Sequence, residues 1–319
     1  MNSKENTFDS GGGQRRHTVI VMQRVGRLGN QIGLLANLIA LSLATGVKVC
    51  HPALGNYANY FKGTVGNLFC CYPPSSSGRH SPPGKLAREA LHKICRLLDK
   101  SGLIRLLLPG RTFASDYVSL VNMTGPSFAA FLCGGRFTLL TKGWFFRHPQ
   151  VHKARFLRAL WEFFALAEPY ASNVERLVKK ARAGCDVLIG VHIRQTDFKE
   201  HAGGKYYFTT ADYAHLMRHC QHLFQPAKVG FLVVSDEPHD SSDFPSSQCS
   251  FGSGIDVEDM YCLGGCDYII GSIASSYSLW PAVLFQKPTF RMASAQDMPG
   301  RDDFRLTMEP WVDTSGEAR

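Results

Sequence analysis

Short apolar runs of strand length alternate with longer apolar segments of helix length in the first fifty residues of the chain. The run 17–23 (HTVIVMQ) is rich in β-branched residues, which predicts a buried strand. The turn 24–30 (RVGRLGN) follows, and the apolar segment 31–45 predicts a helix that ends at Gly46. The run 47–50 predicts a second strand, so these residues form a βαβ unit.

The same alternation returns in the second half of the chain. Strands are predicted over 186–194, 228–235, 267–271 and 287–292, and helices over 210–224, 256–264 and 275–285, with Thr209 or Thr210 as the N-cap of the first helix. Two further helical segments, 149–165 and 169–183, connect the two series. Alternating strands and helices predict parallel sheets that are covered by helices on both faces.

Two such series predict an α/β protein with two Rossmann-like domains that face each other across a cleft. We expect an N-terminal domain over residues 17–175 and a C-terminal domain over residues 176–319. The polar, glycine-rich residues 1–16 predict a disordered leader without the apolar core of a signal peptide. Since no run reaches the roughly 20 apolar residues of a membrane span, we expect a cytoplasmic protein.

The composition is typical of a soluble globular protein, because 45% of the 319 residues are hydrophobic and 19% are charged. The ten cysteines show none of the paired spacings that a zinc site requires. We therefore interpret nearly all of them as small apolar side chains.

The net charge of +9 admits partners that carry phosphate, namely nucleotides, nucleic acid or anionic lipid. Positive charge is densest over 85–105, where apolar residues recur at helical spacing and predict a basic amphipathic helix. Its basic residues are Lys85, Arg88, Lys93, Arg96, Lys100 and Arg105, and its apolar residues are Leu86, Ala90, Ile94 and Leu97. This helix is either solvated or a peripheral contact with a membrane surface. No aromatic-basic interleaving accompanies the charge, so we expect no nucleic-acid partner.

Three stretches with candidate chemistry follow predicted strands, where open α/β sheets bind their ligands. The first contains Gly29, Asn30 and Gln31 at the start of a helix. The helix N-terminus offers N–H groups to a polar or anionic ligand, but an ordinary strand–helix turn explains the glycines equally well. The stretch matches neither a dinucleotide fingerprint nor a P-loop.

The second stretch lies at the end of the predicted strand 186–194. Strand alternation places His192 and Arg194 on one side of this strand. The guanidinium of Arg194 either holds phosphate oxygens, which its fixed fork fits, or pairs with a nearby carboxylate such as Asp197.

The third stretch contains Asp259 on a short helix, and Ser275 and Ser276 at the start of the next helix. Hydroxyl groups at a helix N-terminus can hold a phosphate. Serines at this position also serve as plain N-caps, and the stretch alone does not decide between the two.

Taken together, the order G-x-L-G-N-Q, H-x-R-x-x-D and D-x(7)-D-Y-x-I-x-S-x-x-S-S over about residues 18–290 resembles the fucosyltransferase superfamily. Within it, the closest match is glycosyltransferase family 11, the α-1,2-fucosyltransferases. The resemblance implies a GT-B-like fold with a GDP-sugar site in the C-terminal domain. It assigns Arg194 and Ser275 to the β-phosphate, His192 to the nucleotide and Asp259 to the guanine edge, with Ser276 beside them. It assigns Gly29, Asn30 and Gln31 to the acceptor side.

The resemblance also implies an inverting transfer of fucose from GDP-fucose to a hydroxyl of a glycan acceptor, without a cofactor or a metal ion. Arg194, His192 and Asp197 form the candidate catalytic set, in which Asp197 orients Arg194. Many members carry a second arginine where this chain has Gln195. This departure leaves open a transferase for another GDP-sugar, or a non-catalytic nucleotide- or sugar-binding protein of the same fold. Glu200 and His201 are near the motif in sequence, but no catalytic base can be assigned.

Overall fold

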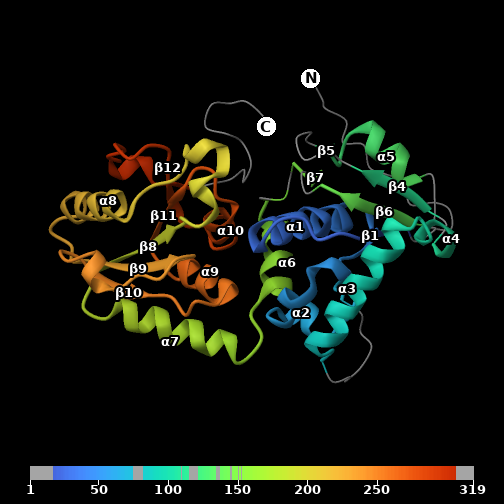
Figure 1. Cartoon of the computed structure of the whole chain (residues 1–319), viewed down its shortest axis with the longest axis horizontal. Helices are drawn as coiled ribbons and strands as arrows, with labels where there is room; N and C mark the ends of the chain where they lie inside the picture. Colours follow the sequence, from blue (N-terminus) through green and yellow to red (C-terminus); the bar gives the residue numbers. More distant parts are fainter. Residues whose placement is uncertain are drawn as a thin grey trace.

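The computed structural model describes residues 17–74, 82–108, 110–114, 121–133, 137–143, 146–149, 151 and 153–306. The expected leader over residues 1–16 lies outside the described residues. The chain forms two α/β halves side by side (Figure 1). The strands of the first sheet lie before residue 143, and those of the second sheet begin at Val187.

The N-terminal half contains a five-stranded sheet in the order β3-β2-β1-β6-β4. Its strands are β1 (Thr18–Val21), β2 (Lys48–Cys50), β3 (Cys71–Tyr72), β4 (Gly110–Ala114) and β6 (Phe137–Lys142), all parallel except for the antiparallel pair β2–β3. Its helices are α1 (Leu28–Thr45), η1 (Pro52–Asn59), α2 (Lys62–Val65), α3 (Lys85–Lys100), α4 (Ile104–Leu107), α5 (Pro126–Cys133) and α6 (Ala154–Phe164). The short strands β5 (Val121–Asn122) and β7 (Phe146–Arg147) pair separately.

The C-terminal half contains a six-stranded sheet in the order β10-β9-β8-β11-β12-β13. Its strands are β8 (Val187–Ile193), β9 (Val229–Ser235), β10 (Gln248–Phe251), β11 (Tyr268–Ser272), β12 (Pro288–Met292) and β13 (Arg305–Leu306), and only β13 is antiparallel to its neighbour. Helix α8 (Thr210–Leu223) lies on one face, and α7 (Tyr170–Arg182) and α9 (Asp256–Gly264) lie on the other (Figure 1). The remaining helices are η2 (Asp197–Lys199), η3 (His201–Gly204), η4 (Ser241–Asp243), α10 (Ser276–Leu284) and η5 (Arg301–Asp303).

The predicted strands and helices of the second series are all present, with ends within about two residues of the prediction. Thr209 is the N-cap of α8 and forms a capping box with Asp212, which satisfies free N–H groups of the first turn. The start of α1 was predicted wrongly. The helix begins at Leu28 rather than Gln31, after a turn at Gly26 with a φ of 71°, so Gly29 and Asn30 lie inside its first turn.

The hydrophobic cores of the two halves are continuous. One cluster of buried residues joins the apolar side chains of α1 to Val257 and Met260 of α9 and to Trp280 and Val283 of α10. By length and composition α1 could cross a membrane, but 78% of it is buried inside the molecule, as in a core helix. A large apolar contact of this kind restricts motion between the two halves.

The cysteines differ from the sequence prediction in one pair. Cys50 and Cys71 form a disulfide bond that links β2 to β3, so these two are not free apolar side chains. Sequence spacing could not show this pair, because only the antiparallel pairing of the two strands brings the cysteines together. The other described cysteines outside the bond are buried or half-buried thiols, as expected.

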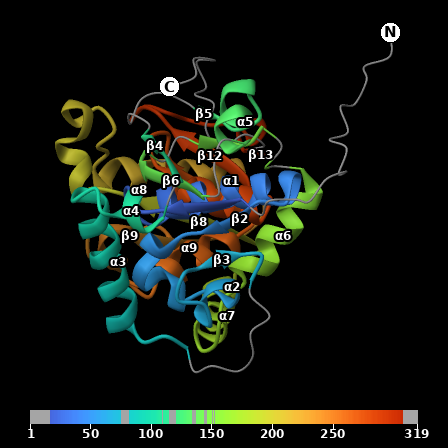
Figure 2. The ribbon, with the colours of Figure 1, turned by 90° about the vertical axis from the view of Figure 1, so that its right-hand side faces the viewer.

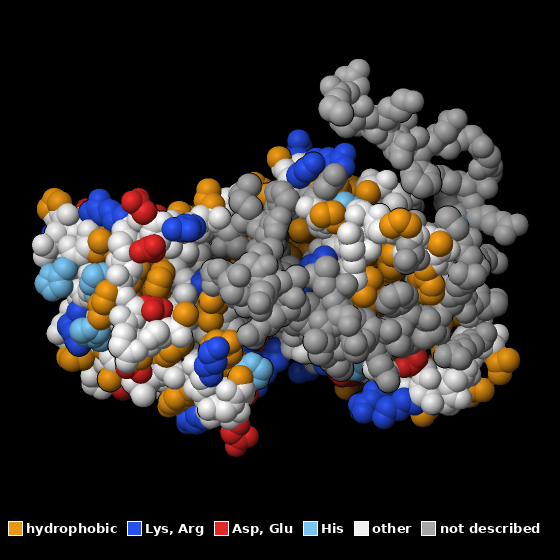
Figure 3. Space-filling model, turned by 90° about the horizontal axis from the view of Figure 1, so that it is seen from above, with side chains coloured by type: hydrophobic (Ala, Val, Ile, Leu, Met, Phe, Trp, Pro, Cys, Tyr) orange, Lys and Arg blue, Asp and Glu red, His pale blue; other side chains and the backbone are white. Residues whose placement is uncertain are grey.

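Charged side chains are distributed in small groups on the face seen from above in Figure 3. Lysine and arginine side chains of the C-terminal half alternate there with acidic and apolar ones. Among the described residues on this face, the positive charge is therefore not gathered into one basic stripe.

Candidate functional site

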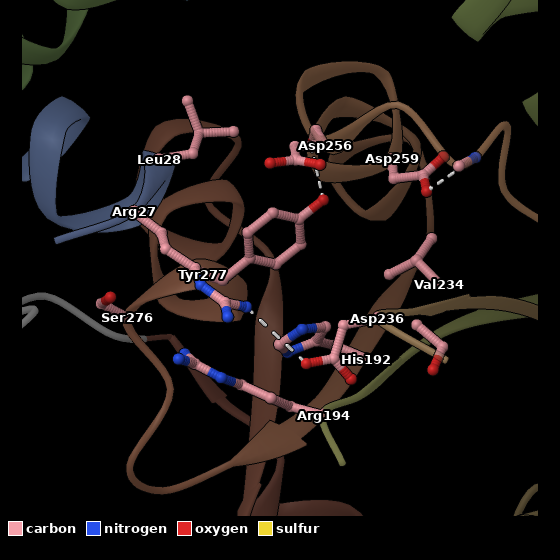
Figure 4. Close-up of a pocket in the computed structure, with 13 residues that line it drawn as sticks. Arg27, Leu28, His192, Arg194, Val234, Asp236, Asp256, Asp259, Ser276 and Tyr277 are labelled. Atoms are coloured by element: carbon pink, nitrogen blue, oxygen red, sulfur yellow. Dashed lines mark hydrogen bonds and ion pairs between the residues drawn. The ribbon is translucent and has the colours of Figure 1, made fainter. Parts of the chain in front are cut away.

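A pocket opens where the two halves meet, at the carboxyl ends of β8 and β9 (Figure 4). Its volume is about 100 Å³. The lining residues come from both halves: Arg27, Leu28 and Gly29 from the first, and His192, Arg194, Val234, Ser235, Asp236, Gly254, Asp256, Asp259, Ser276 and Tyr277 from the second. Open α/β sheets bind ligands at this edge, so the position is that of a substrate site.

His192 projects from the end of β8 and is 5% exposed. Its Nδ1 lies 3.4 Å from Oγ of Ser275, and its ring lies against the ring of Tyr277, with the centroids 4.6 Å apart. Burial and the positive charge of Arg194 lower the pKa of His192 to about 3. The imidazole is therefore neutral at physiological pH and can donate or accept a hydrogen bond without carrying charge.

Arg194 lies directly after β8, and its guanidinium is held on two sides. Its Nε and Nη2 donate to the two carboxylate oxygens of Asp197 at 2.9 and 2.6 Å, and its plane lies over the ring of Phe198 at 4.4 Å. The hydrogen bonds from Arg194 hold the pKa of Asp197 below its usual range. Asp197 itself does not line the pocket. The carboxylate therefore fixes the orientation of the guanidinium, while part of the guanidinium still faces the pocket.

Arg27 brings a second positive charge to the pocket from the N-terminal half. It is the N-cap residue of α1, and its guanidinium lies 3.9 Å from Asp197 and 3.8 Å from Asp236. The turn before it is fixed by the buried amide of Gln31, which donates to the carbonyl of Val25. Gln31 thus holds the turn before Arg27 and does not line this pocket, and its assignment to the acceptor side stays a prediction.

Gly29 and Asn30 form the contact between the two halves beside the pocket. The Oγ of Ser276 donates to Oδ1 of Asn30 at 2.7 Å. A Cβ at Gly29 would lie 2.8 Å from Oγ of Ser276 and 2.9 Å from its backbone carbon. Only glycine allows α1 and α10 to approach this closely, which gives Gly29 a packing function in addition to its place in the pocket lining.

Ser275 lies behind the pocket wall. It is 1% exposed, serves as the N-cap of α10 by accepting from the N–H of Tyr277, and contacts His192. It does not line the pocket, whereas the neighbouring Ser276 does. Ser275 is thus the N-cap of α10, Ser276 lines the pocket, and the contact of either serine with a phosphate stays a prediction.

Two carboxylates lie at the other end of the pocket, on the first turn of α9. Asp259 is 5% exposed and accepts hydrogen bonds from the backbone N–H groups of Ser253 and Gly254 at 2.6 and 3.1 Å. Burial raises its pKa above the ordinary value despite these bonds. Asp256 accepts from the hydroxyl of Tyr57 at 3.2 Å, and its backbone carbonyl accepts from the hydroxyl of Tyr277.

The charged groups of the pocket are distributed unequally. The carboxylates Asp256 and Asp259 lie at one end, the guanidinium groups of Arg27 and Arg194 lie at the other, and the ring of Tyr277 lies between them (Figure 4). At the guanidinium end, Asp236 lies beside Arg27 and Asp197 is paired with Arg194. A ligand that fits this arrangement carries hydrogen-bond donors at one end and negative charge at the other. A nucleoside diphosphate with a donor-rich base has this polarity.

The sequence analysis identified some lining residues and missed others. His192, Arg194, Asp259, Ser276 and Gly29 line the pocket. Asn30, Gln31, Asp197 and Ser275 lie behind the wall and contact lining residues or hold the turn before Arg27. Eight lining residues were missed, namely Arg27, Leu28, Val234, Ser235, Asp236, Gly254, Asp256 and Tyr277. Of these, Arg27 and Asp236 were recognisable as charged residues that follow predicted strands.

Gln195 points away from the pocket. Its amide donates to the carbonyl of Phe208 at 3.0 Å, and its backbone N–H donates to Asp236 at 2.8 Å. The side chain of Gln195 is therefore not part of the pocket lining. Arg27 instead supplies the second guanidinium.

Among the described residues, no group of three or more histidine, cysteine, aspartate or glutamate side chains could hold a metal ion. The carboxylates of the pocket are held by hydrogen bonds from the protein itself.

Comparison with known proteins gives the fold. The structure of a mutant of FUT1 from Arabidopsis thaliana in complex with GDP matches with a TM-score of 0.53 and 14% identity over 90% of this chain and 73% of that one. The chain has the GT-B fold. The α-1,6-fucosyltransferase NodZ co-crystallised with GDP matches with a TM-score of 0.53 and 13% identity over 86% of this chain and 94% of that one. Another structure of NodZ, from Bradyrhizobium, matches with a TM-score of 0.53 and 14% identity over 86% of this chain and 95% of that one.

No protein-family model and no curated protein matches this chain. At identities of 13–14%, the structural likeness extends to the fold. The function must therefore be argued from the site.

Proposed function

We propose that the chain is a glycosyltransferase that moves fucose from GDP-fucose to a hydroxyl group of a glycan acceptor. The observation that carries this proposal is the arrangement of the pocket, with Asp256 and Asp259 at one end and the guanidinium groups of Arg27 and Arg194, each paired with a carboxylate, at the other. Guanine offers paired N–H donors to a carboxylate, and a diphosphate offers oxygens to guanidinium groups. Fucosyltransferases of the same fold have been crystallised with GDP and soaked with GDP-fucose, which supports the choice of nucleotide and sugar.

In this proposal Arg194 and Arg27 stabilise the negative charge that grows on the leaving β-phosphate as the bond to the sugar breaks. Asp197 and Phe198 hold Arg194 in place before the ligand arrives, so little reorganisation is needed in the transition state. Neutral His192 adds a hydrogen bond without adding charge. The acceptor hydroxyl attacks the anomeric carbon from the opposite side, which gives inversion. The acceptor lies on the side of the N-terminal half, near Gly29.

The finer assignment is an α-1,2 linkage, which rests on the motif order in the sequence. NodZ, with the same fold, is an α-1,6 enzyme, so the fold alone supports either linkage. A linkage-specific fucosidase applied to the product distinguishes them.

The first test is a thermal-shift series with GDP, ADP, UDP and CDP. A ligand at 100 times its dissociation constant stabilises the folded state by about 2.7 kcal/mol, which such a series detects. Of the four nucleotides, we expect only GDP to raise the melting temperature. In a separate assay, we expect the protein to transfer labelled fucose from GDP-fucose to acceptor glycans. A shift with ADP or UDP of equal size would refute the guanine assignment. Binding of GDP without transfer to any acceptor would instead identify a non-catalytic nucleotide-binding protein, and transfer from a different GDP-sugar would correct the donor.

A further inference from the structure

Helix α3 has an inner side that does not match its amphipathic pattern. The buried residues of this helix are Arg88, in its first turn, and Cys95. The guanidinium of Arg88 donates to the side chain of Asn59 at 2.8 Å and to the backbone carbonyls of Thr64, Val65 and Asn67 at 2.8–3.0 Å. Arg88, which belongs to the predicted basic face, is thus buried inside the protein, whereas the apolar residues of the predicted pattern are exposed.

The outer side of α3 and the adjoining α4 carries an apolar ridge. We define the apolar ridge as Leu86, Ile94, Leu97, Leu103, Leu106 and Leu107, which are between 48% and 87% exposed. They are half of the twelve exposed large hydrophobic residues in the described part of the chain. The two helices lie together at one edge of the N-terminal half (Figure 2). Large exposed apolar side chains gathered on two neighbouring helices are typical of an interaction site.

A cationic cavity lies beside the apolar ridge. Gln23, Arg24, His92, Arg96 and Lys100 line it, and its volume is about 330 Å³. Arg96 and Lys100 form no ion pair or hydrogen bond with the described residues, and the buried Nδ1 of His92 has no hydrogen-bond partner among them.

Two acidic residues of α3 lie close to this cavity. Glu89 is paired with Arg24 at 3.2 Å, and Asp99 keeps its negative charge while it accepts a hydrogen bond from the neutral amide of Gln23. The lining cations Arg24, Arg96 and Lys100 outnumber these two acids, so an excess of positive charge remains for an anion. Lys93 is exposed on the same helix. An anion of the size of a phosphate group fits both the charge and the space.

We propose that α3 and α4 dock the protein on an anionic lipid bilayer, with the apolar ridge in the boundary between headgroups and acyl chains and a headgroup phosphate in the cationic cavity. Leucines next to lysine and arginine on one helical surface have the composition of an interfacial membrane-binding segment. Negative lipid charge attracts the basic residues, and their long side chains reach the headgroups while the leucines insert. This surface is independent of the proposed transfer reaction.

The test is flotation of the full chain with vesicles of phosphatidylcholine alone and of phosphatidylcholine mixed with phosphatidylglycerol. We expect binding to the mixed vesicles that weakens with added salt. The double variant Arg96→Gln/Lys100→Gln should bind about 25-fold more weakly, at about fivefold for each basic residue. The double variant Leu97→Gln/Leu106→Gln should lose at least about tenfold. The substituted side chains are exposed or line an open cavity, so the fold should not change.

Matched controls lie elsewhere on the surface. Leu43→Gln removes an exposed leucine at the end of α1, and Arg158→Gln removes an 83% exposed arginine of α6, so neither should alter flotation. Equal binding to neutral vesicles, or unchanged binding of the two double variants, would overturn the proposal. A third result would also overturn it: the wild-type chain forms a dimer in solution and does not bind vesicles, and Leu97→Gln/Leu106→Gln abolishes the dimer. The apolar ridge would then join two copies of the chain. Full release from vesicles by millimolar glycerol phosphate would show that the cavity takes a free phosphate ester instead.

Discussion

Arg27 offers the sharpest test of the pocket, because its removal should affect ligand binding and leave the fold almost unchanged. Its side chain is 62% exposed, and its two ion pairs, with Asp197 and Asp236, are 3.9 and 3.8 Å long. Exposed pairs of this kind contribute about 0–1 kcal/mol to stability. The side chain of Arg27 also makes no capping hydrogen bond to α1. We therefore expect Arg27→Gln to change the free energy of unfolding by less than about 1 kcal/mol.

The effect on binding should be much larger. A hydrogen bond from a charged group to a phosphate contributes about 1.5–3 kcal/mol, which corresponds to a loss of about 10- to 150-fold in GDP affinity. Guanosine lacks the phosphates but keeps the base, so its affinity should stay the same. Titration calorimetry with both ligands separates the two contributions. Arg158→Gln, which removes an exposed arginine paired with Glu162 on α6, is the matched control.

Two results would refute this reasoning. If GDP affinity in Arg27→Gln stays within about twofold of wild type, Arg27 does not contact the diphosphate. If GDP and guanosine weaken by the same factor, the substitution has disturbed the whole pocket, and the assignment of the positive end to the phosphates has no support.

The other predictions concern the remaining groups of the pocket and the buried histidines. Asp259→Ala should weaken GDP binding by at least about tenfold and reduce discrimination against ADP in the same titration, since guanine loses its charged acceptor. Arg194→Ala should lower fucose transfer by about 10²–10³ in a radiochemical assay while the fold survives, and Arg194→Lys should be poorly tolerated because the fork is lost. Burial lowers the pKa of His192 and of His51 to about 3. Because these folded-state pKa values lie below the ordinary 6.5, the stability that depends on neutral imidazoles is complete above about pH 6.5 and is lost as the pH falls toward 3. His51→Phe should therefore reduce the slope of unfolding free energy against pH by about 1.4 kcal/mol per unit below pH 6 in urea titrations.

For each of these predictions, the opposite experimental result would contradict the assignment on which it rests. Unchanged GDP affinity in Asp259→Ala would remove the guanine assignment, and near-normal transfer by a folded Arg194→Ala protein would remove the phosphate assignment. An identical pH slope in wild type and His51→Phe would mean that this histidine is protonated inside the folded protein.

The parts of the fold that depend on the local pattern of apolar and polar residues were predicted best. The buried strands β8 and β9 are continuous apolar runs, and α9 begins and ends where its pattern does. The start of α1 was predicted wrongly because Gly29 and Asn30 are typical turn residues. Their presence in a helix has a distant cause, since Gly29 accommodates α10 and Asn30 accepts a hydrogen bond from Ser276.

Only part of the site was predicted, because only some of its residues follow from local sequence pattern. His192 and Arg194 follow a strand whose end is visible in the sequence, so their place at the sheet edge could be inferred. Arg27 and Asp256 join the site only because the two halves pack together, and no local pattern encodes that contact. The family resemblance supplied Asp259, but it could not show that Ser253 and Gly254 already occupy part of its carboxylate.

The contact between the halves explains how the site can be ordered before a ligand binds. The core continues from α1 into α10 through Trp280, and polar contacts close the same seam, from Ser276 to Asn30 at 2.7 Å and from Tyr57 to Asp256 at 3.2 Å. Folding therefore fixes the position of Arg27, in the first half, relative to the charged groups of the second half. These groups are Asp256, Asp259 and Arg194. A donor that binds here need not draw two domains together, so less of its binding energy is spent on ordering the protein and more remains to favour the transition state.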